Sequence, residues 1–361
     1  MPKPVLSAML SCSGLELTDA EKRIFAEFNP LGVTLFGRNI AAPYQIKKLV
    51  AQIKENIGRN DVLIAIDQEG GRVRRRHEPD FRGYMAQKQI GEIAESHGLK
   101  TAKKIAAAHA SLIAEDLYAL GINWNYAPVI DLCHPQTSRV LASRCFSAAP
   151  ETNIALAQAM LDAYKNSAVC PCIKHLPALG PAETDPHLEL PVIRQSLKEL
   201  EKDFAAAVAL AGKTPAAMTA HILLPQIDNR QPATQSPKII SEIIRGLIGF
   251  NGFLISDAID MRALHGSLAL KTQLSLDAGC DAVCYCGGTE QGLVEVYKNY
   301  RPLNDASRSR FEKLHNIITG QHKTVDIAQI YKDYSQFSAN LKNYDKEYDA
   351  TEVLHLMTSN Q

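Results

Sequence analysis

Short apolar segments alternate with helix-like segments along most of the chain, and this alternation limits the possible folds more than any other feature. Each apolar segment is short and rich in aliphatic residues, as in a buried strand. Eight such candidate strands are Pro4–Leu10, Gly32–Phe36, Val62–Ile66, Ile122–Ala127, Val169–Ile173, Ala216–Ala220, Phe253–Ile255 and Ala282–Tyr285.

Between these strands, apolar residues recur at spacings of three and four, which is typical of amphipathic helices. Connections of helical length join parallel strands rather than antiparallel ones. Eight parallel strands with intervening helices make a closed barrel of ~250 residues. The sequence therefore predicts an α/β fold, a TIM-like (β/α)8 barrel. The clearest intervening helices are Pro43–Ile57, Leu99–Leu120, Glu151–Asn166, Leu197–Ala211 and Ser241–Leu247.

The pattern becomes helical and polar after Gly287. Gln291–Tyr300 and Asp305–Ile318 are predicted to be helices that complete the barrel, and Val325–Glu352 is predicted to be a helical extension. No linker and no second core are evident. We therefore expect one domain over residues 1–361, with a barrel at approximately 4–320 and a C-terminal extension at approximately 321–361.

Charge and composition narrow the class of ligand. The 39 basic residues balance the 39 acidic ones, so the chain lacks the positive charge expected for binding nucleic acid or anionic membranes. The basic run Arg72–His77 is interpreted as a ligand-facing loop. No apolar run approaches the ~18 residues of a membrane span, and Val5–Leu10 is shorter than the ~7 to 15 apolar residues of a secretory signal. A small ligand, with no nucleic acid and no membrane insertion, fits best.

The eight cysteines lie mostly in or beside apolar runs, which favours reduced thiols in a cytoplasmic protein. Cys170/Cys172 and Cys284/Cys286 are spaced by two residues within candidate strands, so alternation on a sheet explains them better than metal binding. The DQEGG segment beginning at Asp67 lacks the glycine spacing of a dinucleotide fingerprint. We expect no metal and no cofactor.

Polar residues follow five consecutive candidate strands, from the third to the seventh. The carboxyl ends of the strands in such a barrel meet on one face, where active sites lie. The sequence therefore predicts a polar ligand site on that face. The residues are Asp67, Asp131, the pair Lys174 and His175, His221 and Asp257.

Two sites carry groups suited to catalysis. Asp257 ends the apolar run of GFLISDAIDM, so a strand would hold its carboxylate rigidly as a nucleophile or electrostatic stabiliser; Asp260 is a competitor that could instead cap a helix. Asp185 and His187 flank a single proline, so an extended backbone directs both side chains the same way. The carboxylate can then hold one imidazole nitrogen while the other faces a substrate, which makes His187 a candidate general acid/base.

Six motifs occur in an order that resembles glycoside hydrolase family 3, in particular its single-domain bacterial β-N-acetylglucosaminidases. The resemblance extends over roughly residues 5–300. The motifs are DQEGGRV (Asp67–Val73), NYAPVIDL (Asn125–Leu132), SRCFS (Ser143–Ser147), KHLPALG (Lys174–Gly180) followed by Asp185 and His187, MTAHI (Met218–Ile222) and GFLISDAIDM (Gly252–Met261).

The resemblance implies a role for each matching residue. Asp257 matches the nucleophile that forms a glycosyl-enzyme, and His187 matches an acid/base that Asp185 orients. Asp131 is expected to be structural. The implied reaction is removal of N-acetylglucosamine from muropeptides during peptidoglycan recycling in the cytoplasm. The implied sugar-binding residues are Asp67, Arg75, Arg144, Lys174 and His175.

The chain departs from the family pattern at several positions. Ala178 and Leu179 replace a Gly and a His, Ala258 stands where a second Asp often follows the nucleophile, and Cys145 stands where Ser is usual. Two alternatives therefore remain open: a catalytically weakened or inactive sugar-binding barrel, and a specificity like that of family 3 β-glucosidases. The sequence also leaves open the aglycone, water or phosphate as acceptor, and the oligomeric state.

Overall fold

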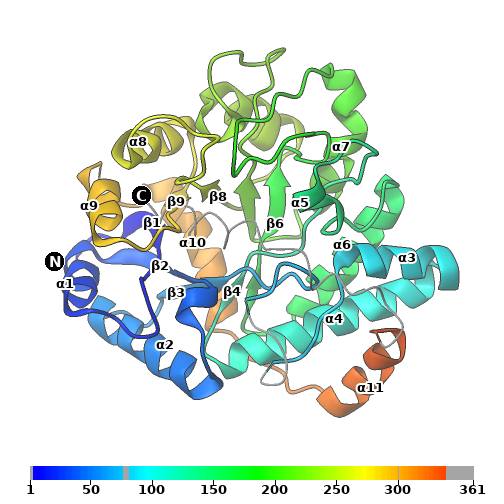
Figure 1. Ribbon diagram of the computed structural model, residues 1–361, viewed down its shortest axis with the longest axis horizontal. Coiled ribbons are helices and arrows are strands. Elements are labelled where there is room, and N and C mark those ends of the chain that lie inside the picture. The colour runs from blue at the N-terminus through cyan, green and yellow to red at the C-terminus, as the bar shows by residue number, and fades with distance from the viewer. Residues whose placement is uncertain (1–2, 76–80, 300, 339–361) are drawn as a thin grey trace.

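The strands form one parallel sheet that follows the order of the chain. The computed structural model describes residues 3–75, 81–299 and 301–338. Figure 1 shows the strands at the centre of the molecule with the helices arranged around them. Apart from β5 and β6, which do not pair with each other, each strand pairs with its neighbours in the sequence, and the last returns to the first through Ala8 and Val283. The strands are β1 (Leu6–Leu10), β2 (Pro30–Leu35), β3 (Leu63–Ile66), β4 (Trp124–Asn125), β5 (Cys170–Pro171), β6 (Ile173–Leu176), β7 (Ala216–Thr219), β8 (Phe253–Ala258) and β9 (Ala282–Cys284).

The strands β5 and β6 are consecutive pieces of a single segment. β5 pairs with β4 and β6 pairs with β7, so the barrel closes through this segment and the predicted TIM-like fold is confirmed. The predicted end of the fifth strand at Ile173 is wrong, because β6 continues to Leu176 and contains Lys174 and His175. The end of a strand depends on backbone pairing, here of Lys174 with Met218, and not on side-chain polarity.

Two further strand ends differ from the prediction. β8 continues to Ala258 instead of ending at Ile255, so Asp257 lies within the strand. β4 contains only Trp124 and Asn125, so Asp131 lies six residues beyond it and does not follow the strand directly. Backbone pairing with β6 still holds the segment before Asp131, through a parallel bridge between Val129 and Lys174 and a hydrogen bond of 2.7 Å from the Ile130 N–H to the Lys174 carbonyl.

The helices start and end at recognisable signals. Thr18 and Ser196 cap their helices in capping boxes with glutamates at the third helical position, and Pro43 and Pro150 stand at the start of theirs. The predicted helix Ser241–Leu247 is observed as a π-helix that begins at Ile239. The helices are α1 (Asp19–Phe28), η1 (Gly37–Asn39), α2 (Pro43–Ile57), α3 (Gln87–His97), α4 (Leu99–Ala119), α5 (Arg139–Ala142), α6 (Pro150–Tyr164), α7 (Leu197–Leu210), η2 (Ala233–Gln235), η3 (Ile239–Leu247), α8 (Leu268–Ala278), α9 (Glu290–Lys298), α10 (Asp305–Ile318) and α11 (Ile327–Ser338).

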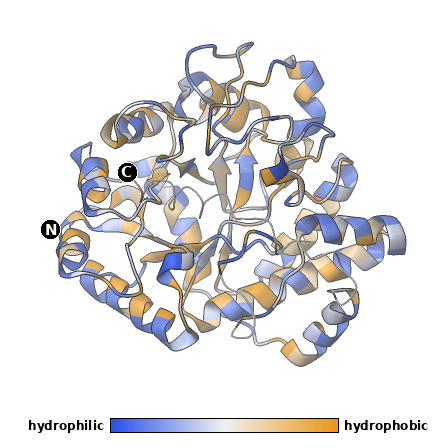
Figure 2. Cartoon of the chain, in the orientation of Figure 1, coloured by the Kyte–Doolittle hydropathy of each residue, from blue (hydrophilic) through white to orange (hydrophobic). Residues whose placement is uncertain are grey.

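The core has an inner and an outer part because successive strand residues face opposite sides of the sheet. The inner cluster contains Trp124, Phe253 and Met218, together with Phe311 and Leu314 of α10. The outer cluster fills the space between strands and helices. In Figure 2 the helices carry both hydrophobic and hydrophilic residues, as expected for helices with one face against a core.

The C-terminal part of the described chain is helical. α11 packs against α4, as Figure 1 shows, and it occupies part of the predicted extension Val325–Glu352. The helix begins at Ile327 rather than Val325, and residues 339–352 lie outside the described residues. Within the parts of the chain that the structure describes, no helix combines the length and apolar character needed to cross a membrane.

Candidate active site

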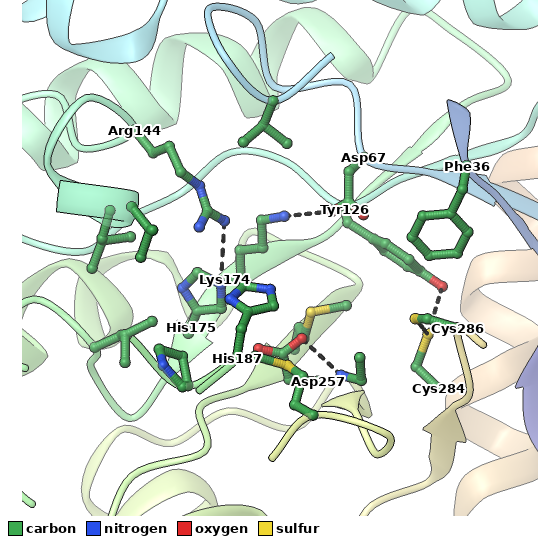
Figure 3. A pocket seen from close by; sticks show the side chains of 18 of the residues that line it. Phe36, Asp67, Tyr126, Arg144, Lys174, His175, His187, Asp257, Cys284 and Cys286 are labelled. Atoms are coloured by element: carbon green, nitrogen blue, oxygen red, sulfur yellow. Dashed lines mark hydrogen bonds and ion pairs between the residues drawn. The ribbon is translucent and has the colours of Figure 1, made fainter. Parts of the chain in front are cut away.

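A cavity opens at the carboxyl ends of the strands. Residues from β6, β7, β8 and β9 and from the loops after the strands line it (Figure 3). All but one of the eight predicted site residues line this cavity, and the exception, Asp185, contacts one that does. The predicted residues on the cavity wall are Asp67, Arg75, Arg144, Lys174, His175, His187 and Asp257.

Asp257 is presented by the penultimate position of β8. Its Oδ1 accepts the Ala258 N–H at 2.8 Å, and its own N–H donates to the Thr219 hydroxyl at 3.3 Å. Burial raises the pKa of this carboxyl, but the imidazoles of His221 and His175 lower it to a net value below the usual range. The group is therefore a carboxylate at neutral pH, as a nucleophile must be.

Asp185 and His187 form the pair that the sequence predicts. The Nδ1–H of His187 donates to Asp185 Oδ1 at 2.6 Å, and the His187 N–H donates to the same oxygen at 2.9 Å. Although burial raises the pKa of Asp185, its hydrogen bond and charge interaction with His187 keep that pKa below its usual value. The bond occupies Nδ1, so Nε2 is the ring nitrogen that can serve a substrate.

One hydrogen bond and one electrostatic interaction relate the Asp185–His187 pair to the segment that carries Asp257. The carbonyl of Pro186 accepts the Ala263 N–H at 3.2 Å, which joins the Asp185–His187 segment to the loop after β8. Burial raises the pKa of Asp257, and His187 is among the groups that lower it, after His221, His175 and the Ala258 N–H. The candidate acid/base and the candidate nucleophile therefore lie within electrostatic reach of each other.

A buried network of charges forms another part of the site. Lys174 Nζ lies 2.6 Å from both Asp67 Oδ1 and Glu69 Oε1. Arg144 holds Glu69 with two hydrogen bonds of 2.9 and 2.8 Å, and Arg75 bonds Asp67 at 2.8 Å. Glu69 is 1% exposed. Sequence reasoning missed it, although it lies in the DQEGG motif two residues after Asp67.

The network fixes the protonation of its members. Burial raises the pKa of Asp67 and of Glu69, but the facing cations lower both to net values below the usual range. Burial lowers the pKa of Lys174, but the two carboxylates raise it above the usual range. Every member is therefore charged at neutral pH, and Lys174 keeps its three donor hydrogens.

Asp131 orients His175 rather than facing a ligand. It accepts the His175 Nδ1–H at 2.7 Å and the Leu179 N–H at 2.6 Å. With Nδ1 as donor, His175 Nε2 is an acceptor, and Arg144 approaches it at 3.5 Å. His221 also lies behind the cavity wall, since its nitrogens bond Thr234 Oγ1 and the Ala258 carbonyl.

The opposite part of the cavity is aromatic and sulfur-rich. The Sγ atoms of Cys284 and Cys286 in this part are 3.7 Å apart. Its other lining residues are Phe36, Tyr126 and Met218. All eight cysteines lie within the described residues, and none of them is in a disulfide. In residues 3–75, 81–299 and 301–338, no group of three or more His, Cys, Asp or Glu is arranged to hold a metal ion.

Asp260, the competitor of Asp257, and two aromatic residues of the β4 segment lie near the site. Asp260 does not cap a helix: its Oδ1 accepts the Cys286 N–H at 3.1 Å, and Ser267 caps α8. Trp124 is fully buried in the inner core, whereas Tyr126 reaches the cavity and its hydroxyl lies 3.0 Å from Thr34 Oγ1.

Comparison with known proteins gives concordant matches. The model of the glycosyl hydrolase family 3 N terminal domain matches residues 8–314. The β-hexosaminidase of Bordetella avium is 35% identical over 289 residues, which cover 79% of this chain and 81% of that protein. The β-hexosaminidase of Pseudomonas aeruginosa strain PAO1 is 35% identical over 283 residues, covering 78% of this chain and 82% of that protein. The structure of NagZ from Neisseria gonorrhoeae in complex with N-trifluoroacetyl-D-glucosamine superposes with a TM-score of 0.83 and 30% identity, over 93% of this chain and 98% of that one.

Proposed function

The chain belongs to glycosyl hydrolase family 3, and from this premise we propose that it is a retaining β-N-acetylglucosaminidase that acts on muropeptide-type substrates through a covalent intermediate on Asp257. The observation that carries the proposal is one cavity lined by an ionised carboxylate on a strand and by a histidine held through Nδ1 by a carboxylate. These are the two groups that a double displacement needs.

In the first step, Asp257 attacks the anomeric carbon, and protonated His187 gives its Nε2 proton to the glycosidic oxygen. The aglycone leaves as an alcohol, and the sugar becomes an ester of Asp257. Asp185 stabilises the imidazolium before the transfer and fixes the orientation of the ring.

In the second step, neutral His187 removes a proton from water as the water attacks the anomeric carbon. The bond to Asp257 breaks, so its carboxylate is regenerated and the β-configuration is retained. The same residue acts first as acid and then as base, which microscopic reversibility requires.

The charged network supports recognition of a polar sugar. Lys174 and Arg144 offer N–H donors to hydroxyl and amide oxygens, and the exposed edge of Asp67 offers an acceptor for sugar hydroxyls. Arg72 and Arg75 also line the cavity, and their positive charge suits a substrate that carries muramic acid or peptide carboxylates. Reduced thiols fit a cytoplasmic role in peptidoglycan recycling.

The first test is release of nitrophenol from 4-nitrophenyl N-acetyl-β-glucosaminide and from the matching β-glucoside. We expect turnover of the N-acetyl substrate by the wild type, with rate losses of at least about 10³-fold in Asp257→Asn and about 10²-fold in His187→Ala. Products formed with and without inorganic phosphate show whether water or phosphate accepts the sugar. Preference for the β-glucoside would contradict the proposed specificity, and full activity of Asp257→Asn would contradict the proposed nucleophile.

A further inference from the structure

One tyrosine on α11 is fully buried, although it lies far in the sequence from every residue of the site. Tyr334 of α11 is 0% exposed. Its hydroxyl accepts the Met85 N–H at 2.7 Å and lies 2.9 Å from Nδ1 of His109 on α4. The family match ends at residue 314, so Tyr334 lies beyond the segment that defines the family.

His109 connects this tyrosine to the active site. Its Nε2 lies 2.8 Å from the backbone carbonyl of Glu69. A carbonyl can only accept, so Nε2 carries the hydrogen, and Nδ1 accepts from the Tyr334 hydroxyl. Burial lowers the pKa of His109 to about 4, which keeps the ring in the neutral form that this pattern requires. The donors thus run from Met85 to Tyr334 to His109, and the imidazole donates to Glu69.

The backbone after Glu69 is packed closely against the same two residues. A Cβ atom on Gly70 would lie 2.2 Å from the Met85 carbonyl oxygen and 2.8 Å from Cε1 of His109, and φ at Gly70 is +102°. Only glycine fits such a position without strain. The turn that follows Glu69 is therefore seated directly on His109 and Met85, the two partners of Tyr334.

We propose that Tyr334 and His109 are positioning residues for sugar binding, because they hold the Glu69 backbone and so aim the Glu69 carboxylate at Lys174 and Arg144. The inference rests on the proposed function, since Lys174 and Arg144 are the residues to which it assigns the sugar. It gives α11 a part in activity. α11 packs against α4, and its Phe337 contacts the ring of His97 at the end of α3; this packing places the Tyr334 hydroxyl beside His109.

The hydrogen bonds from Tyr334 through His109 to Glu69 reach only the charged network of the site. Glu69 directly contacts Lys174 and Arg144, whereas Asp257 lies on β8 and His187 follows β6. Loss of the link should therefore weaken binding of the sugar more than it slows bond cleavage. A split between KM and kcat distinguishes this role from a general loss of stability.

The decisive variant is Tyr334→Phe, which removes the hydroxyl and keeps the ring. Its matched control is Tyr331→Phe on the same helix, where the tyrosine is 39% exposed. For Tyr334→Phe we expect KM for 4-nitrophenyl N-acetyl-β-glucosaminide, and Kd for N-acetylglucosamine by calorimetry, to rise about tenfold with kcat within about threefold of the wild type. Tyr331→Phe should match the wild type in all three.

A second pair of variants tests the imidazole. His109→Gln supplies an amide donor for the Glu69 carbonyl and an acceptor for Tyr334, whereas His109→Leu supplies neither. Kd should rise less in His109→Gln than in His109→Leu. If folded Tyr334→Phe keeps KM and Kd within twofold of the wild type, the positioning role is wrong, whatever its Tm. Measuring Kd requires no turnover. If the wild type binds the sugar without cleaving it, the proposed function is wrong, but the Kd values of the variants still test the positioning role of Tyr334 and His109.

Discussion

At the scale of single residues, the site depends on charges that are costly to bury separately and stable only together. Lys174 is 2% exposed and Glu69 is 1% exposed, and each is compensated by partners within hydrogen-bonding distance. Sequence reasoning identified Lys174, Arg144 and Asp67 through motifs. It missed Glu69 because a carboxylate between Gln68 and Gly70 gives no local sign that two distant cations converge on it.

Replacing Glu69 tests how far the network depends on it. Glu69→Gln keeps the size of the side chain but leaves Lys174 and Arg144 with one carboxylate fewer in a buried setting. We expect a loss of about 3 kcal/mol in unfolding free energy and a rise in KM of at least about tenfold. Chemical denaturation and steady-state kinetics measure the two effects. The exposed Glu55→Gln is the matched control and should alter neither; an unchanged KM in Glu69→Gln would mean that the network does not orient Lys174 and Arg144 for the proposed sugar binding.

The same charges set the response of stability to acid. The pKa values of Asp67 and Glu69 in the folded protein lie below those of the unfolded chain, near ~3.9 and ~4.3, so unfolding takes up protons as the pH falls. Their stabilisation is complete above the unfolded values and is lost as the pH drops toward the folded ones. Tm should therefore fall between about pH 5 and pH 3. Asp67→Asn should flatten this slope relative to Glu55→Gln, and equal slopes would contradict the assignment.

At the scale of elements, tertiary contacts determine where strands end and which loops are held. The helical periods predicted α2 and α10 with their observed bounds, because amphipathic spacing and capping signals are local. The ends of β6 and β8 were predicted too early, since pairing with β7 and β9 carries each ladder past the apolar residues. The turns that bring Asp185 and Glu69 into the site were not predictable, because they depend on contacts with distant segments.

The helix α3 illustrates such a contact. Gln87 donates to the carbonyl of Arg144 at 2.9 Å and accepts the Val129 N–H at 3.0 Å, so α3 fixes the segment that carries Arg144. A Cβ on Gly91 of α3 would lie 1.7 Å from the Phe146 carbonyl oxygen in that segment. The helix therefore approaches the site segment at a distance that only glycine permits.

Replacing Gly91 by alanine tests whether helix propensity or the close approach to the Phe146 carbonyl has the larger effect on stability. Gly91→Ala should gain about 1 kcal/mol of propensity in an isolated helix, but the clash should make the folded protein less stable by about 2 kcal/mol net. KM should rise as the Arg144 segment is displaced. Thermal denaturation and kinetics measure both. Gly212→Ala, where a Cβ would meet no atom within 4 Å, is the control and should be neutral; a stabilised Gly91→Ala would contradict the packing argument.

At the scale of the whole molecule, the cavity gathers residues from Phe36, which follows β2, to Cys286, which follows β9, so a bound sugar would contact segments that are far apart in the sequence. The order of strands around the barrel could be predicted, because each βα unit is adjacent to the next. The burial of Tyr334 on α11 could not be predicted, because Tyr334 is one of several tyrosines in a polar segment and only the fold buries it.

Ligand-induced stabilisation separates the enzyme from a barrel that only binds sugar. A ligand at 100 times its Kd adds about 2.7 kcal/mol to folding stability, so N-acetylglucosamine should raise Tm by a few degrees while glucose has little effect. Asp257→Asn should show the same rise without turnover, because the carboxylate is needed for attack and its amide has almost the same shape.

If the wild type shows the rise but no turnover, the barrel binds sugar without catalysis, and the replacement of the family's Gly and His by Ala178 and Leu179 becomes the leading structural explanation. Leu179 lines the cavity and is held by Asp131, so restoring the family's residues at these positions should then restore turnover if the loop is responsible.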